Sequence, residues 1–82
     1  MNTLRKGGIY KLPDGSSFIA MPAGEGDYFL YEQKQGFSAP PYYLIDTEGE
    51  ITTYPSGRVI AWRAKDLKDT GETHRPDQPG SM

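Results

Sequence analysis

Cysteine is absent from the 82-residue sequence, which excludes disulfide bonds, thiolate metal sites and cysteine nucleophiles. Aliphatic residues and phenylalanine are scarce, since Leu, Ile, Val and Phe together number 14. Six tyrosines and one tryptophan supply further apolar surface, because a buried aromatic side chain covers about 150–250 Å². The formal net charge is only −2, so this composition predicts a folded chain whose core depends on aromatic side chains.

Long apolar runs and a basic excess are also missing. No stretch approaches the roughly 20 apolar residues that span a bilayer, and the first residues contain no apolar signal core. We therefore expect no membrane partner and a cytoplasmic location. The slightly acidic balance makes nucleic acid the less favoured class of partner, because phosphate binding usually requires a basic surface.

Catalytic and metal-binding residue types are few. The single histidine, His74, falls in a polar C-terminal stretch, where we expect a solvated side chain without the fixed partners that catalysis needs. Asp46 and Glu50 are expected to face each other beside a turn, in water that screens any coupling between them. The sequence thus predicts no enzyme activity, no catalytic residue, no metal site and no cofactor.

The length of the chain predicts a single domain, and a change of composition predicts a separate C-terminal tail. From Thr70 to the end the chain contains no aliphatic residue before Met82, and Gly, Pro, Asp, Gln and Ser dominate. We therefore predict a single small β-barrel-like domain over residues 1–69 and a disordered C-terminal tail over residues 70–82.

Short runs rich in Tyr, Ile, Phe, Thr and Val predict an all-β fold. Gly, Pro and Asp separate these runs, and each run has about the usual length of a strand. The predicted strands are residues 8–12, 17–21, 28–33, 42–46, 51–54 and 58–62.

Three similar tripeptides predict tight hairpin loops. A proline or threonine comes first, a small or acidic residue second, and a glycine third, as in a type I turn followed by a left-handed residue. These tripeptides are Pro13-Asp14-Gly15, Thr47-Glu48-Gly49 and Pro55-Ser56-Gly57.

Three-residue loops fix the register of each hairpin. They predict the facing pairs Tyr10–Phe18, Ile45–Ile51 and Thr53–Val59. One face of the segment 42–62 then carries Tyr43, Ile45, Ile51, Thr53, Val59 and Ala61, and the other carries Tyr42, Leu44, Thr52, Tyr54, Ile60 and Trp62. Since neither face is polar, both are covered or one is a binding surface.

The predicted architecture is a five- to six-stranded antiparallel meander that closes into an SH3-like partial barrel, with a short helical turn near residues 64–67. The alternative is an open meander that completes its core by dimerisation.

The surplus aromatic surface is the main functional indication. Tyr, Trp and Arg are the residue types that dominate interface hot spots. The predicted interaction face consists of Tyr42, Tyr54, Arg58, Trp62 and Arg63. The favoured function is a non-enzymatic interaction module that binds a protein partner or a second copy of itself. The alternative is a small-barrel nucleic-acid binder that stacks bases on the same aromatic and arginine side chains.

Overall fold

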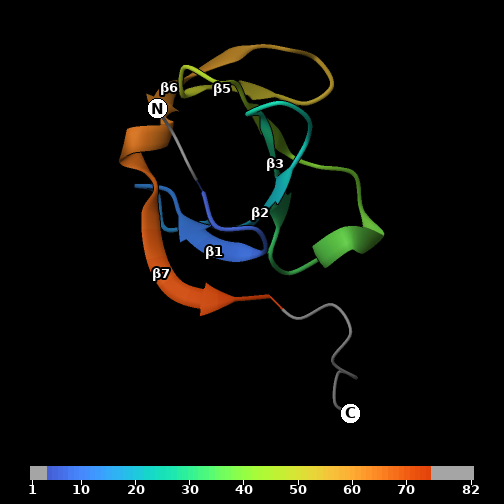
Figure 1. Ribbon diagram of the computed structural model, residues 1–82, viewed down its shortest axis with the longest axis vertical. Helices are drawn as coiled ribbons and strands as arrows, with labels where there is room; N and C mark the ends of the chain where they lie inside the picture. The colour runs from blue at the N-terminus through green and yellow to red at the C-terminus, as the bar shows by residue number, and fades with distance from the viewer. Residues whose placement is uncertain (1–3, 75–82) are drawn as a thin grey trace.

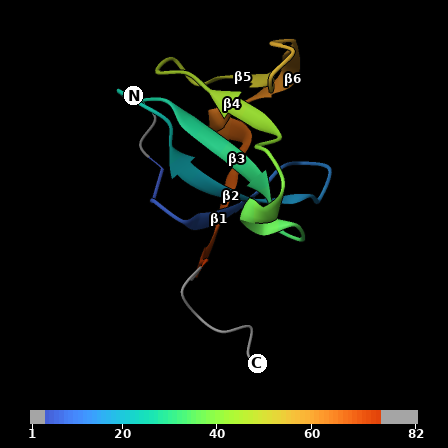
Figure 2. The same cartoon turned by 90° about the vertical axis from the view of Figure 1, so that its right-hand side faces the viewer.

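A computed structural model describes residues 4–74, which form one seven-stranded antiparallel sheet in the order β6-β5-β4-β3-β2-β1-β7. The sheet curls into a half-barrel (Figure 1). Figure 2 shows β1 to β4 side by side, with β5 and β6 beyond them. The elements are β1 Gly8–Lys11, β2 Ser17–Pro22, β3 Tyr28–Glu32, the 3₁₀ turn η1 Gly36–Ser38, β4 Tyr43–Ile45, β5 Glu50–Thr53, β6 Val59–Arg63, the 3₁₀ turn η2 Ala64–Asp66 and β7 Lys68–Thr73.

The predicted all-β antiparallel meander closing into a partial barrel is confirmed, and so is the late helical turn, which is η2. The sheet has one strand more than the largest predicted number. That strand, β7, pairs with β1 through Gly8–Thr73 and Lys11–Lys68. The predicted boundary after residue 69 is therefore wrong, because it falls inside β7. Residues 75–82 of the predicted tail lie outside the described residues.

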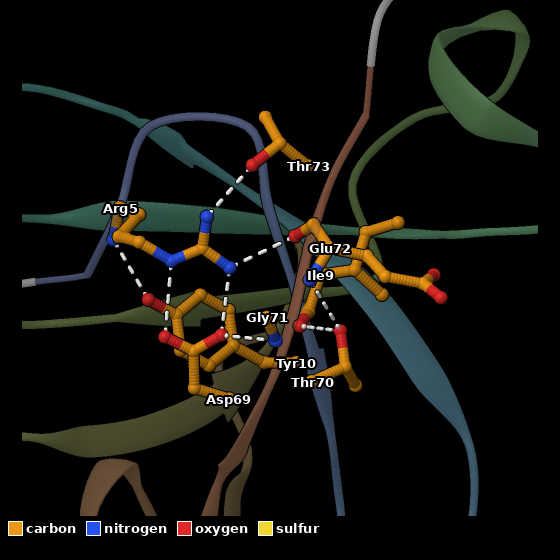
Figure 3. A network of polar contacts seen from close by, with 8 residues as sticks. All are labelled: Arg5, Ile9, Tyr10, Asp69, Thr70, Gly71, Glu72 and Thr73. Atoms are coloured by element: carbon orange, nitrogen blue, oxygen red, sulfur yellow. Dashed lines mark hydrogen bonds and ion pairs between the residues drawn. The ribbon is translucent and has the colours of Figure 1, made fainter.

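Strand β7 is held to the N-terminal segment by the guanidinium group of Arg5 (Figure 3). This group donates hydrogen bonds to Asp69 Oδ1 at 2.6 Å and Oδ2 at 3.0 Å, to Thr73 Oγ1 at 2.7 Å and to the Glu72 carbonyl at 2.8 Å. The hydrogen bonds from Arg5, and then one from the Gly71 amide, lower the pKa of Asp69. An ion pair between distant parts of the sequence thus fastens a strand whose side chains are all exposed.

His74 continues this attachment. Its amide donates a 2.7 Å hydrogen bond to the Gly7 carbonyl, and its ring packs edge-on against Phe37 with the ring centroids 5.1 Å apart. Phe37 in turn packs against Tyr31, at 4.8 Å. The prediction of a solvated tail residue is therefore wrong for His74, whose side chain is half-buried.

The core fills the concave face of the sheet. Every second residue along a strand points into this core, as in a half-buried sheet. Leu30, Ile45 and Ile51 have no exposed surface. Half-buried Ile60 and Trp62 pack against the same cluster. The buried members of this cluster are Tyr10, Leu12, Phe18, Ala20, Leu30, Ile45, Ile51 and Ala64.

The first two predicted hairpin registers are confirmed. Tyr10 pairs with Phe18, and Ile45 pairs with Ile51. Glycine at φ +85° ends the second loop, where Gly49 donates a 3.0 Å hydrogen bond to the Asp46 carbonyl. Both loops therefore contain three residues and end in a left-handed glycine, as predicted.

The third register is wrong by one residue. The Thr53 amide donates a 2.8 Å hydrogen bond to the Arg58 carbonyl, so the loop between them contains four residues. The Thr53 hydroxyl accepts a further hydrogen bond from the Arg58 amide at 3.1 Å. Thr52 consequently pairs with Val59. A shift of one residue exchanges the two faces of a strand. Val59 is thus 60% exposed, while Trp62 faces the core.

Candidate functional site

The five residues of the predicted interaction face do not lie together. Trp62 packs against the core, and the Arg63 guanidinium, at the far end of β6, donates to the Glu48 carbonyl at 3.2 Å. Arg58 is exposed at the start of β6. Tyr42 and Tyr54 are adjacent, because the Tyr54 amide donates a 3.1 Å hydrogen bond to the Tyr42 carbonyl. The candidate site is therefore built around these two tyrosines.

Both tyrosines are exposed and held in place. Tyr42 is 54% exposed and Tyr54 is 41% exposed. The Tyr42 ring lies 5.8 Å from the buried Phe18 ring, and the Tyr54 ring meets Phe29 edge-on at 4.9 Å. Edge-to-face and tilted packing of this kind fixes ring orientation. The two phenol groups are thus presented by a rigid support.

The chain around Tyr42 is positioned by residues that cannot continue a strand. Pro40 and Pro41 lack a backbone N–H, which ends strand pairing, and they stand before β4. The Tyr42 amide donates a 2.7 Å hydrogen bond to the Leu30 carbonyl on β3. The β5–β6 loop, on the other side of Tyr42, begins with the Tyr54–Pro55 peptide bond, which is cis.

These segments enclose a groove of about 260 Å³, which we call the Tyr42–Tyr54 groove. Its lining combines two aromatic rings, three prolines and one carboxylate. The lining residues are Glu32, Gln35, Ala39, Pro40, Pro41, Tyr42, Tyr54 and Pro55. The groove therefore offers apolar walls with a single negative group, Glu32, at the end of β3.

Two other hollows lie at the Pro13–Gly15 turn and have a different character. One, of about 300 Å³, is lined by the turn and by Glu32, Gln33 and Lys34. The other, of about 390 Å³, is lined by Lys11, Asp66 and Lys68 together with turn residues. No aromatic side chain lines either hollow, whereas two tyrosines, a hot-spot residue type, line the Tyr42–Tyr54 groove.

Next to the groove, burial raises the pKa of the Tyr43 phenol, and the neighbouring Tyr42 adds to the shift. Tyr43 packs its ring edge-on against both Phe18 and Tyr42, at 5.3 Å and 5.2 Å. The Tyr43 ring thus joins Phe18 in the aromatic support behind Tyr42.

Three groove features escaped the sequence prediction. Phe29 supports Tyr54 from the outer face of β3, while Glu32 and Pro55 line the groove. The alternation of Phe29 and Tyr31 around the buried Leu30 is the signal that could have placed aromatic rings on the outer face. Glu32 carries no comparable signal, because its role depends on the loop that follows it.

The Asp46 carboxylate at the second hairpin stabilises the turn. One oxygen of Asp46, Oδ1, accepts hydrogen bonds from the Glu48 and Glu50 amides, both at 2.9 Å. Over residues 4–74 no group of three or more His, Cys, Asp or Glu side chains is arranged to hold a metal ion. Within the same range, no helix has the length and apolar character needed to cross a membrane.

Comparisons with known proteins give no family for this chain. No protein-family model, no curated protein and no solved structure matches it. Function must therefore be inferred from the geometry of the groove.

Proposed function

We propose that this chain is a small non-enzymatic interaction module that binds a protein partner through the Tyr42–Tyr54 groove. One observation carries the proposal: two large aromatic side chains, both exposed, line one apolar groove. The proposal includes the cytoplasmic location expected from the sequence.

The exposed aromatic surface is energetically large. A tyrosine covers about 150–250 Å², so burying the exposed half of each ring would contribute about 2–3 kcal/mol before the costs of association. Tyr42 and Tyr54 are already fixed by Phe18 and Phe29, so little side-chain freedom is lost on binding. Preorganised aromatic side chains are typical anchors of protein interfaces.

A protein partner suits the groove better than nucleic acid does. Glu32 is the one charged residue in the lining, and its carboxylate would repel phosphate. Trp62, the residue expected to stack on bases, packs against the core, and Arg63 lies at the other end of β6. Two of the residues proposed for nucleic-acid binding, Trp62 and Arg63, are therefore separated from the tyrosines.

The proposal is tested by selecting peptide ligands of this chain from a random library. A phage-displayed library of random twelve-residue peptides is selected on the full chain, and the enriched peptides are synthesised and titrated. Tyr42→Ala and Tyr54→Ala should each weaken binding about tenfold or more, as truncation of a hot-spot residue does. Val59→Ala is the matched control, because Val59 is even more exposed than the two tyrosines but lies outside the groove. Its affinity should equal that of the parent chain.

Several outcomes would overturn the proposal. The library could yield no enriched peptide, or the enriched peptides could bind the tyrosine variants as tightly as the parent. Binding of a single-stranded oligonucleotide that falls steeply with salt would favour the nucleic-acid alternative instead. A dimer on a sizing column that Tyr42→Ala dissociates would support the proposal, with a second copy as the partner.

A further inference from the structure

We infer that the Tyr42–Tyr54 groove binds a proline-rich segment in the polyproline II conformation, with a basic residue placed against Glu32; this rests on the proposed function. The inference starts from the unusual composition of the walls, in which Pro40, Pro41 and Pro55 accompany the two tyrosines. Each of these features restricts the class of ligand.

The backbone around the groove argues against strand addition. Strand β4 lies between β3 and β5, and β5 lies between β4 and β6, so neither has a free edge. The groove is instead made by the β3–β4 connection and the β5–β6 loop. An added β-strand would find no open ladder of N–H and C=O groups here. Recognition must therefore come from side-chain packing and isolated hydrogen bonds.

A polyproline II segment satisfies those conditions. It makes no internal hydrogen bonds, so its carbonyl oxygens are free to accept. The phenol groups of Tyr42 and Tyr54 and the amide of Gln35 can donate to them. Proline brings no N–H that would need an acceptor, and its ring packs on aromatic faces. Both surfaces are rigid before they meet, which reduces the entropic cost of association.

The size of the groove agrees with a short segment. Its volume of about 260 Å³ lies below the roughly 300–1,000 Å³ of pockets that enclose drug-sized molecules. A polyproline II helix has three residues per turn and rises about 3.1 Å per residue, so only one or two side chains of a bound segment would enter the groove. The remainder would lie along the surface.

Glu32 supplies the charge preference. It is a half-buried carboxylate at the groove, and Gln35, Ala39 and the prolines around it carry no charge. An arginine in the ligand can meet a carboxylate with two parallel hydrogen bonds, which a lysine cannot do. The groove should therefore prefer proline-rich segments with an arginine beside the prolines.

The experiment uses three blocked, fluorescently labelled nonapeptides and the full chain. The first has one arginine followed by eight prolines, the second has glutamine in place of that arginine, and the third keeps the arginine but replaces the prolines with alternating glycine and serine. Anisotropy titrations at low salt should show the first peptide binding at least tenfold more tightly than the third. Tyr42→Ala and Tyr54→Ala should remove most of this difference, and Val59→Ala should preserve it.

Glu32→Gln tests the charge preference. It should weaken the arginine-proline peptide about two- to fivefold, the effect of losing one exposed ion pair, and leave the glutamine-proline peptide unchanged. High salt should reduce the same difference, because it screens exposed charges.

The failures can be told apart. If the proline peptides bind no better than the glycine-serine peptide while library-selected peptides bind and depend on Tyr42 and Tyr54, the ligand class is wrong and the proposed function stands. If neither kind of peptide binds, both are wrong. Equal loss of the arginine and glutamine peptides on Glu32→Gln would refute the assignment of Glu32.

Discussion

The substitution Val59→Thr tests the register of β6, on which the separation of Trp62 from the two tyrosines depends. Val59 is 60% exposed and pairs with Thr52 on the face away from the core. Threonine has nearly the shape of valine and an equally good strand propensity. In this position the hydroxyl would meet water, so the free energy of unfolding should change by no more than about 0.5 kcal/mol.

The alternative register gives a different magnitude. A three-residue loop would place Val59 beside Ile51 on the core face, where burying a hydroxyl without a partner costs about 1–3 kcal/mol. The reference substitution is Ile51→Val, because Ile51 has no exposed surface and loss of one buried methylene costs about 0.5–1.5 kcal/mol. A domain with about 70 ordered residues has a free energy of unfolding of about 4–10 kcal/mol, so both changes are measurable.

The assay is urea unfolding followed by circular dichroism, with the midpoint compared at constant slope. The structure requires Ile51→Val to be more destabilising than Val59→Thr. The reverse order would show that Val59 is a core residue. In that case Trp62 would face outward, and the five residues of the predicted interaction face would lie together.

Two further predictions concern β7 and the connection between β2 and β3. Arg5 lowers the pKa of Asp69 below the usual 3.8, so the contribution of this ion pair to the stability of the fold is complete above pH 3.8. That contribution is lost as pH falls through the lower pKa of the folded state. An Asp69 carboxyl titration by NMR with a midpoint at or above 3.8 would contradict this. Gly26→Ala should cost more than the ~1–2 kcal/mol of strain expected for Gly15→Ala, since both have positive φ but only the Gly26 Cβ would approach Thr47 Cγ2, at 2.6 Å. Adding Thr47→Ser should bring the cost back to that of Gly15→Ala, and an unchanged cost would refute the contact.

Local turn chemistry accounts for what the sequence could predict of the fold. A tight three-residue turn requires a left-handed residue at its end, and glycine meets that requirement at positions 15 and 49. The pairs Tyr10–Phe18 and Ile45–Ile51 follow from this turn geometry alone. The third loop differs in containing four residues, and within it the Thr53 hydroxyl accepts a hydrogen bond from the Arg58 amide.

Strand β7 could not be predicted from its own residues. Its sequence, Lys-Asp-Thr-Gly-Glu-Thr, has no apolar alternation, and every side chain is exposed. Its place in the sheet depends on pairing with β1 and on Arg5, which lies 64 residues before Asp69. Such a long-range contact leaves no local pattern.

Of the predicted site, Tyr42 and Tyr54 come together because both flank strands that pair directly, β4 and β5. Trp62 and Arg63 depend on the register of β6, and a shift of one residue was enough to separate them from the tyrosines. Glu32 joins the groove only through the fold of the β3–β4 connection.

The most direct measurement is the amide NMR spectrum of the full chain during titration with the arginine-proline nonapeptide. We expect the largest shift changes to surround Tyr42 and Tyr54 and to include Glu32 and Gln35, while Val59 and Trp62 stay unchanged. Shift changes centred on Val59 and Trp62, or none at millimolar peptide, would contradict it.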